Sequence, residues 1–446
     1  MQQQQRKIVS IDYVVPLSAN KDERILLATK LGPVDKISYA DQTIALNPSH
    51  YYRKEKDWKQ KIQVMLLDAT DVVTIELDDS ILEDADGNQI VIHMVLMLAI
   101  SMPDIYKVIV SHKGHTKRKL VEDCIALVKR RHEAMLLSMV PGNVATPAAL
   151  VQFFKEKLGK LKNTSCKVWD HKALHRQSFG LITAIGNSSS VHPPAMIAAT
   201  RRGVAKNGKH ICIVGKGVTF DSGGLAIKPF KHMRDQKFDK IGAIYAGYVF
   251  EHIVQDERLK DHTITCILPF AENVISDTAP RPGDVIKSYL GKTVEISNPD
   301  AEGRLLIADA FGYAHHIKPD LLIDVATLTG HAQRVSCWHS GYYYTENKML
   351  KEAVETRSND LGERMIPMPT WPDYDDVLSS TVADLLNSPE KCSDAFVAAL
   401  FLKQFVPPSC DWLHIDLSHS VSRMIPTTKG MMTMIDAIHS WLESKK

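Results

Sequence analysis

The sequence predicts an α/β protein: a large C-terminal part with a mixed, largely parallel sheet covered by helices, plus a smaller N-terminal α/β domain. The C-terminal part contains continuous apolar runs at 210–215 (HICIVG), 263–270 (TITCILPF) and 321–328 (LLIDVATL). Strands buried on both faces of a parallel sheet have such runs. Helical stretches at 238–254 and 302–317 separate them, and this alternation is typical of a parallel sheet covered by helices.

The first part of the chain mixes short β-like runs with polar turns, at residues 8–15, 63–69, 72–77 and 89–97. A helix-like stretch follows from Lys117 to about Met139, and its apolar residues recur near helical spacing. Its basic cluster, Lys129-Arg130-Arg131, is interpreted as a solvated helix face, with a docking patch as the alternative.

A Pro/Gly-broken turn follows this helix, and Thr146-Pro147 is expected to open another one. At 446 residues the chain is too long for one ordinary hydrophobic core. We therefore expect two domains, residues 1–140 and 141–446, with a connecting helix between them. A fourth apolar run at 412–417 is expected to extend the second sheet.

Composition and charge narrow the function classes. The net charge is +2, so electrostatics gives no reason to expect nucleic acid or a membrane surface as the main partner. The N-terminus has no apolar run long enough for a signal peptide. Seven scattered cysteines without a C-x-x-C pair fit reduced thiols better than a disulfide framework. We expect a cytoplasmic protein.

A glycine-rich loop follows the first apolar run of the second part, at 215–224 (GKGVTFDSGG), with Lys228 close behind. Phosphate binding is the first interpretation to test. Phe220 stands where G-x-G-x-x-G needs its third glycine, and the P-loop spacing is absent. The loop instead lets the backbone approach a compact site that presents Lys216, Asp221 and Lys228.

Further carboxylates come from two other segments. Asp239 begins the next helical stretch, and Asp300, Glu302 and Arg304 stand in 298–304 (NPDAEGR). If that segment stays extended, residues 300, 302 and 304 point to one side. A surface salt-bridge cluster is the alternative. Acids from three segments at the carboxyl ends of buried strands would repel one another unless a cation held them.

Carboxylate-rich sites suit Mg²⁺, Mn²⁺ or Zn²⁺. Two ions could share Asp221 and Glu302 and lower the pKa of a bridging water. A metal-bound Lys216 must be a neutral amine, which needs a strongly depressed pKa beside two cations. The H-E-x-x-H zinc signature is absent from the sequence.

Several segments resemble the signatures of the leucyl aminopeptidase family, the M17 metallopeptidases. They are VGKGVTFDSGGLAIKP, NPDAEGRLLIADA and DVATLTG, supported by VPGNVATPAAL, AIGNSSSVHPP and ADLLNSPEKCSDAFVAALFLKQFV. The resemblance covers roughly residues 135 to 440 and implies a metal-dependent aminopeptidase that releases N-terminal amino acids from peptides through a hydroxide bridging two metals. It also implies a homohexamer and two divalent ions per subunit, Zn²⁺ or Mn²⁺ with Mg²⁺ or Co²⁺ as alternatives.

The resemblance assigns a role to each matching residue. The metal ligands match Lys216, Asp221, Asp239, Asp300 and Glu302. The lysine that polarises the scissile carbonyl matches Lys228, and the arginine that holds a bicarbonate matches Arg304. Contacts to substrate match Thr327, Leu328 and Gly330. All seven metal-site and catalytic identities are intact.

Three departures from the family pattern bear on specificity. Gln236 stands where the family commonly has Met in the pocket for the first side chain of the substrate. Ser418-His419 replaces the usual Ala-Gly at that pocket, which puts a preference for leucine in doubt. Lys240 adds a charge next to Asp239, and on a helix it should point away from its neighbour's side.

Two rival functions belong to other classes. One is a non-catalytic family member kept as a structural or binding protein, which the loss of any metal ligand would favour. The other is an added nucleic-acid-binding role, which only the basic stretch 113–131 could support.

Overall fold

The structure is a computed structural model. It describes residues 8–11, 72–77, 107–112, 118–330, 340–360, 363–369, 371–389, 394–417, 421–422, 425–426 and 430–445. The chain divides into two compact units, Met1–Glu133 and Ala134–Lys446. The predicted domains, residues 1–140 and 141–446, stay a prediction beside this division.

The described part of the first unit contains a three-stranded sheet in the order β1-β3-β2. Strand β1 (Ile8–Ile11) is antiparallel to β3 (Lys107–His112), and β2 (Val72–Leu77) is parallel to it. The predicted run at 72–77 is therefore a strand. The predicted runs at 63–69 and 89–97 lie outside the described residues.

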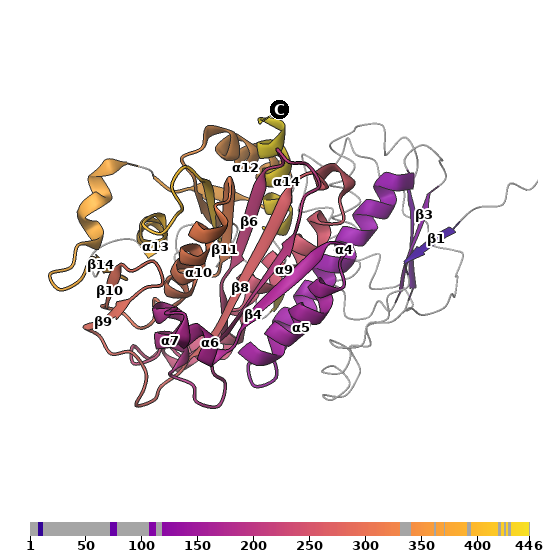
Figure 1. The fold of residues 1–446 in the computed structure, drawn as a ribbon. Coiled ribbons are helices and arrows are strands. Elements are labelled where there is room, and N and C mark those ends of the chain that lie inside the picture. Colours follow the sequence, from indigo (N-terminus) through magenta and orange to yellow (C-terminus); the bar gives the residue numbers. More distant parts are fainter. Residues whose placement is uncertain are drawn as a thin grey trace, which may run out of the picture. The chain divides into compact units, whose positions relative to one another are not determined.

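One nine-stranded sheet forms the centre of the larger unit, in the order β13-β12-β15-β11-β6-β8-β5-β4 with β7 beside β8 (Figure 1). Strands β15, β11, β6 and β8 run parallel, while β12 and β5 are antiparallel to their neighbours in this group. A mixed, largely parallel sheet is thus confirmed. The strands are β4 (Thr164–Trp169), β5 (Ala195–Arg201), β6 (His210–Gly215), β7 (Gly217–Asp221), β8 (Thr263–Asn273), β11 (Leu321–Ala326), β12 (Gly341–Tyr344), β13 (Met365–Pro367) and β15 (Asp411–Asp416).

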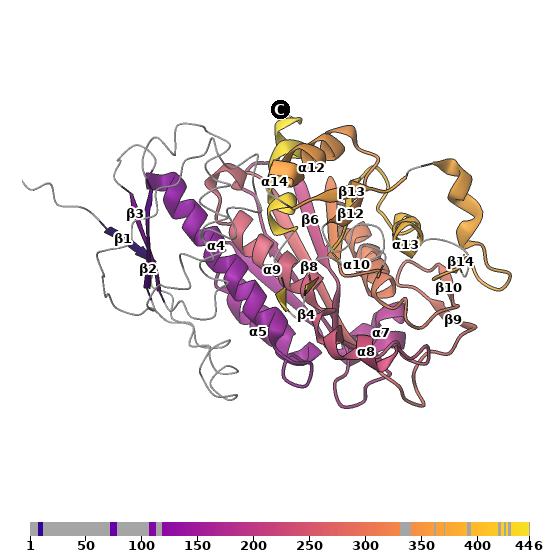
Figure 2. The same ribbon diagram turned by 180° about the vertical axis from the view of Figure 1, so that it is seen from behind.

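Helices cover both faces of this sheet, as Figures 1 and 2 show from opposite sides. Helices α5 (Pro147–Gly159) and α9 (Ile241–Ile253) lie on one face. The other face is covered by α7 (Gly180–Gly186), α10 (Gly303–Ile317) and α13 (Asp394–Lys403). The apolar runs are buried on both sides, because each strand residue meets one helical layer or the other.

Successive side chains of a strand point to opposite faces of the sheet, so they pack into different parts of the hydrophobic core. In β6, Cys212 and Val214 belong to the hydrophobic cluster that also contains Phe311 of α10 and Phe401 of α13. Ile211 and Ile213 are equally buried but are not part of that cluster. Cys166, Cys212, Cys266 and Cys410 are free thiols.

A second, small sheet lies apart from the main one and has the order β14-β10-β9. Strand β10 (Thr293–Ile296) is antiparallel to β9 (Asp284–Lys287) and parallel to β14 (Leu385–Leu386). It leads directly into the predicted acidic segment 298–304. The remaining elements are α4 (Arg118–Met139), α6 (His171–Arg176), α8 (Phe230–Met233), α12 (Lys348–Asp360), α14 (Met431–Glu443), β16 (Val421–Ser422), β17 (Ile425–Pro426) and the 3-10 helices Arg234–Phe238, Glu257–Leu259 and Pro372–Leu378.

The predicted helices at 117–139 and 302–317 match α4 and α10 closely. The one predicted at 238–254 begins later, at Ile241, because Arg234–Phe238 forms a 3-10 helix first. Lys240 is fully buried at this junction. Its Nζ donates to the carbonyl oxygens of Val140 (2.8 Å), Ser138 (3.3 Å) and Lys237, so it caps the C-terminus of α4.

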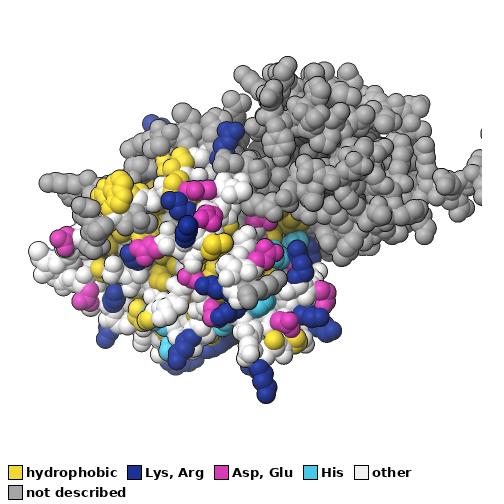
Figure 3. Space-filling view, turned by 90° about the horizontal axis from the view of Figure 1, so that it is seen from above, with side chains coloured by type: hydrophobic (Ala, Val, Ile, Leu, Met, Phe, Trp, Pro, Cys, Tyr) yellow, Lys and Arg dark blue, Asp and Glu magenta, His cyan; other side chains and the backbone are white. Residues whose placement is uncertain are grey.

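On the face of the molecule seen in Figure 3, positively and negatively charged side chains of the described residues lie interspersed. Within the described ranges, no helix is both long and apolar enough to cross a bilayer.

Candidate metal centre

The polar residues predicted for the site gather at the carboxyl ends of the central strands. Lys216 follows β6, Asp221 ends β7, and Thr327 follows β11. Because these strands are parallel to one another or to β8, their carboxyl ends meet at the same edge. Ligands of open α/β sheets bind at this edge.

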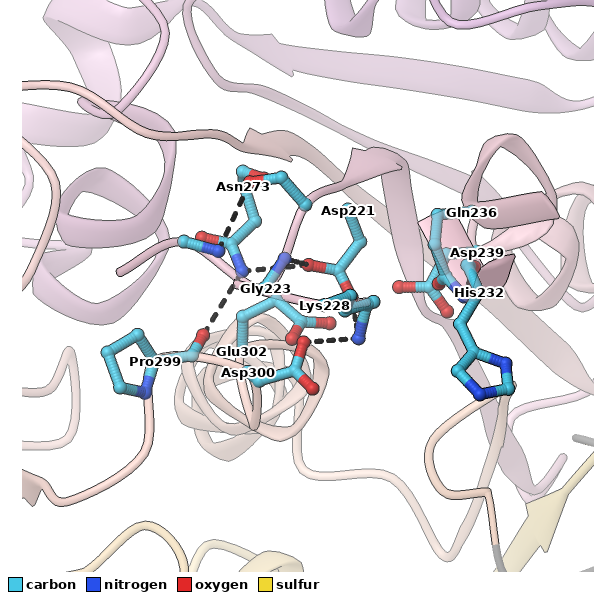
Figure 4. A network of polar contacts seen from close by, with 12 residues as sticks. Asp221, Gly223, Lys228, His232, Gln236, Asp239, Asn273, Pro299, Asp300 and Glu302 are labelled. Carbon is cyan, nitrogen blue, oxygen red and sulfur yellow. Dashed lines mark hydrogen bonds and ion pairs between the residues drawn. The ribbon is translucent and has the colours of Figure 1, made fainter. Parts of the chain in front are cut away.

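Three carboxylates meet there. One oxygen from each of Asp221, Asp300 and Glu302 can be chosen so that all three lie within 4.8 Å of one another. Figure 4 shows these side chains directed towards one another, with Lys228 beside them. Asp221 and Glu302 are buried, whereas Asp300 is partly exposed.

Lys216 joins the fourth carboxylate to this group. Its Nζ lies 2.7 Å from Asp239 Oδ2 and 2.9 Å from Glu302 Oε1, and it donates to the carbonyl oxygen of Thr327 at 2.9 Å. The lysine stem runs past Gly303, where an added Cβ would lie 2.3 Å from Lys216 Cε. A side chain at 303 would therefore displace the Lys216 amine from its position between Asp239 and Glu302.

Lys228 lies on the other side of the cluster. Its Nζ is 2.8 Å from Asp221 Oδ2 and also contacts Asp300. The loop between them turns at Gly223, which has φ +86° and whose amide donates to Asp221 Oδ1 at 2.8 Å. A side chain at 223 would be strained, so this glycine lets the loop fold back and bring Lys228 to the carboxylates.

The segment 298–304 does not stay extended, which corrects the prediction for it. Ala301 N donates to Asn298 O at 3.1 Å, Glu302 has helical φ and ψ, and Arg304 belongs to the first turn of α10. Asp300 and Glu302 reach the cluster because a turn and a helix start place them there. Strand alternation plays no part.

The carboxylates perturb one another strongly. Burial, together with the charges of Asp221 and Glu302, raises the pKa of Asp300 to about 7. Burial also raises the pKa of Asp239 to about 8, although Lys216 opposes the shift. For Glu302, burial acts upward, but Lys216 and Lys228 outweigh it and hold its pKa below the ordinary value.

The two lysines respond in the opposite sense. Burial lowers the pKa of Lys216, but the negative charges of Asp239 and Glu302 raise it by more than burial lowers it. The pKa of Lys216 therefore lies above its ordinary value. For Lys228, burial likewise lowers the pKa, and the charge of Asp221 helps to raise it above the ordinary value. The depressed pKa predicted for Lys216 depends on two bound cations, and it stays a prediction.

The residues present fit divalent metal ions. Four carboxyl groups surround two ammonium groups, so when all four are ionised they outnumber their counter-charges by two. Glu302 Oε2 is buried and has no hydrogen-bond partner among the described residues. A buried anionic oxygen without a partner is costly unless a cation binds it. Carboxylate oxygens and an amine are ligands that Mn²⁺ and Zn²⁺ accept.

The residues predicted to contact substrate lie around the cluster. Thr327 Oγ1 donates to Asp239 Oδ1 at 2.8 Å, Leu328 is half-buried, and Gly330 is the last described residue of its loop. Gln236 is half-buried, and its Nε2 donates to the carbonyl oxygen of His232 at 2.9 Å. Ser418 and His419 lie outside the described residues.

Arg304 is buried in the first turn of α10, and its Nη1 donates to the carbonyl oxygen of Asn387 at 2.7 Å.

Sequence reasoning missed three polar residues at this centre. Asn273 ends β8 and donates to Asp221 Oδ1 at 2.8 Å and to Pro299 O at 3.1 Å. The other two are Asn387 and Asp416, and Asp416 accepts from Leu328 N and Thr329 Oγ1. Asn273 could have been found, because it stands at the carboxyl end of a buried strand as Asp221 does.

Comparison with known proteins shows which family the chain resembles. A family profile described as the cytosol aminopeptidase family, catalytic domain, matches residues 133–436. A probable cytosol aminopeptidase of Syntrophotalea carbinolica is 37% identical over 281 residues, covering 62% of this chain and 55% of the relative. One from Mycobacterium marinum is 38% identical over 320 residues, covering 70% and 61%. The matched part thus spans little more than half the length of these relatives.

Solved structures agree in fold. The bottromycin maturation enzyme BotP in complex with Mn has a TM-score of 0.73 at 27% identity, covering 85% of each chain. Leucine aminopeptidase of Caenorhabditis elegans has a TM-score of 0.73 at 27% identity, covering 83% of this chain and 76% of that one. The leucyl aminopeptidase of Leishmania major, in complex with actinonin, has a TM-score of 0.76 and covers 87% of this chain and 78% of that one. It is 22% identical, so this likeness supports the shared fold and nothing beyond it. Because the profile covers well over half of the sequence and includes every residue of the carboxylate–lysine cluster, the chain belongs to the cytosol aminopeptidase family.

Proposed function

We propose that this protein is a metal-dependent aminopeptidase that releases the N-terminal residue of peptides. The observation that carries this proposal is the convergence of Asp221, Asp300 and Glu302 beside two lysines at the carboxyl edge of the sheet. Family membership supports the same reaction, as does the Mn in the BotP complex.

Two divalent ions, Mn²⁺ or Zn²⁺, would be held by Lys216, Asp221, Asp239, Asp300 and Glu302. When bound, they would supply a water of lowered pKa and Lewis acidity at the scissile carbonyl. The surrounding residues fix the ligands in place: Thr327 Oγ1 orients Asp239, while Asn273 and the amide of Gly223 orient Asp221. Such supporting contacts set ligand orientation and metal affinity.

Lys228 would stabilise the negative charge that develops on the carbonyl oxygen of the substrate. Its ammonium group lies at the partly exposed side of the cluster, beside Asp300, where a peptide can approach. A preorganised cation at that point acts mainly in the transition state. Arg304, at the N-terminus of α10, would hold a small anion such as bicarbonate, which the helix terminus also favours.

The pocket for the first side chain would contain Gln236 together with Ser418 and His419. A leucine side chain in such a pocket would leave these polar groups without hydrogen-bond partners. We therefore propose a weaker preference for leucine, with small or polar first residues comparatively favoured. The hexamer implied by the family resemblance and the cytoplasmic location expected from the sequence stay predictions.

Replacement of the metal ligands tests the proposal. Asp300→Ala and Glu302→Ala should lower metal content and abolish hydrolysis of aminoacyl fluorogenic substrates, because fewer anions remain to offset two dications. Metal is counted by mass spectrometry after dialysis against Mn²⁺. Glu156→Ala is the matched control, since Glu156 is exposed on α5 and contacts Gln152. Full activity in either ligand variant would refute the assignment.

Lys228→Ala separates chemistry from metal binding in the same experiment. It should retain nearly normal metal content but lose kcat by about a hundredfold, the usual effect of removing one electrostatic stabiliser. If this variant lost its metal instead, Lys228 would be a ligand or a structural counter-charge. If the unsubstituted protein bound metal but hydrolysed no peptide, the non-catalytic alternative would be correct.

A further inference from the structure

Asn387 is a fully buried amide beside the carboxylates, and its side chain holds the turn that carries two of them. It follows strand β14, which runs parallel to β10, and its backbone amide donates to Glu295 O at 3.0 Å. The two strands are therefore fixed together where β10 ends and the acidic turn begins.

The carboxamide bonds to the backbone on both sides of this turn. Its Oδ1 accepts from Ser297 N at 2.9 Å, from Ser297 Oγ at 3.0 Å and from Asn298 N at 3.2 Å. Its Nδ2 donates to Asn298 O at 2.8 Å and to Ala301 O at 3.4 Å. One side chain thus satisfies donors and acceptors of 297–301, the backbone from which Asp300 and Glu302 extend.

The same residue also reaches Arg304, whose Nη1 donates to the carbonyl oxygen of Asn387 at 2.7 Å. The carboxamide offers both an acceptor and a donor here, whereas an ionised aspartate would offer acceptors alone. Buried backbone groups left without hydrogen-bond partners destabilise a structure, so the turn depends on this amide for its conformation.

We propose that Asn387 is a positioning residue of the metal centre: it fixes the turn 298–302 and Arg304, and thereby sets metal affinity and turnover without touching metal or substrate. The proposal rests on the proposed function for its turnover part, whereas its metal part concerns binding alone. Substitution of residues that support metal ligands typically costs 10–100-fold in affinity or activity.

The test uses the full-length protein and Mn²⁺ as the probe. Asn387→Asp keeps the shape and the acceptor but removes both donor bonds. Isothermal titration calorimetry should show its Kd for Mn²⁺ raised about 10- to 100-fold. At saturating Mn²⁺, kcat should fall several-fold while KM changes little, because the carboxylates and Arg304 are displaced together.

Asn347 provides the matched control. It is a partly buried asparagine whose Oδ1, like that of Asn387, accepts a backbone bond, here from Leu350 N at 3.0 Å at the start of α12. Asn347→Asp should leave the Kd for Mn²⁺ unaltered, whereas a merely structural role of Asn387 would affect both variants alike. If Asn387→Asp does not fold, the uncharged Asn387→Ser replaces it in the same titration.

A Kd and a kcat within twofold of the unsubstituted protein in the folded Asn387 variants would overturn the positioning role and leave the proposed function intact. Conversely, loss of Mn²⁺ affinity in Asn387→Asp, in a protein that hydrolyses no peptide even when unsubstituted, would support the positioning role and refute the peptidase assignment.

Discussion

Gln236 lies on the short 3-10 helix Arg234–Phe238, three residues before the predicted metal ligand Asp239. Its Nε2 donates to the carbonyl oxygen of His232 at 2.9 Å, and Figure 4 shows both residues beside Asp239. The amide nitrogen therefore has one partner close by in the sequence.

Gln236→Met is expected to shift the preference towards leucine and methionine. An apolar wall no longer leaves an amide unsatisfied against an apolar substrate, and one such change is worth roughly 1–3 kcal/mol. The ratio of kcat/KM for leucyl over seryl substrates should thus rise about tenfold. Lys231→Met, on the exposed side of α8, is the control. A tenfold preference of the unsubstituted protein for leucine over every polar residue would show that Gln236 does not line the pocket.

Helix α7 begins without a side-chain cap of its own, since its N-cap residue, Phe179, makes no such bond. Asp309 of α10 takes this role from a distant part of the sequence. Its Oδ2 accepts from Leu181 N at 2.8 Å and Ile182 N at 3.0 Å, and its Oδ1 accepts from Tyr289 N at 2.7 Å. One buried carboxylate thereby ties α7, α10 and the residues after β9 together.

Asp309→Asn should lower the free energy of unfolding by about 1–3 kcal/mol, because an amide nitrogen would face one of the three donors. Burial raises the pKa of Asp309 to about 7, against the effect of these backbone donors. The folded state therefore binds the proton more tightly, and the contribution of Asp309 falls as pH rises from about 4 to about 7. The difference between the two proteins should be largest near pH 4.

Urea unfolding at a series of pH values measures this difference. Asp384→Asn is a control of opposite sign, since hydrogen bonds from Thr293 lower the pKa of Asp384 and its contribution is lost as pH falls. A difference between Asp309→Asn and the unsubstituted protein that grew with pH would contradict the role of Asp309.

The elements that could be predicted are those whose own residues determine them. Strand β6 and helix α10 have long apolar runs and were predicted within a residue. Strands β12 and β13 were not predicted, because β12 is four residues long and β13 three, and both depend on pairing at the edge of the sheet. Strand β8 continues to Asn273, three residues beyond its predicted end, because pairing with β7 extends it.

Individual residues also differ in whether their own part of the sequence, or only contacts with distant segments, reveals their role. Asp221 and Lys216 could be identified because each directly follows or ends a recognisable strand. Asn387 and Asp309 could not, because neither has a local signal and their hydrogen-bond partners lie 83 to 128 residues away or in another element. Contacts of this kind appear only once the chain has folded.

Divalent ions at the carboxylate cluster should stabilise the larger unit, Ala134–Lys446, which contains every residue of the cluster. A ligand that binds only the folded state shifts the unfolding equilibrium, by about 2.7 kcal/mol at a free concentration of 100 times Kd. Urea unfolding followed by tryptophan fluorescence, in Mn²⁺ and in EDTA, measures this gain, since five of the six tryptophans belong to that unit.

Glu302→Ala is the decisive comparison for this stabilisation. It removes the buried carboxylate that contacts Lys216 and whose second oxygen has no hydrogen-bond partner among the described residues. Most of the gain in Mn²⁺ should disappear with it, while Glu156→Ala, on the exposed side of α5, should keep the full gain. An equal gain in Glu302→Ala would mean that Mn²⁺ stabilises the folded protein from another position, because a cluster short of its most buried anion cannot hold the ions with unchanged affinity.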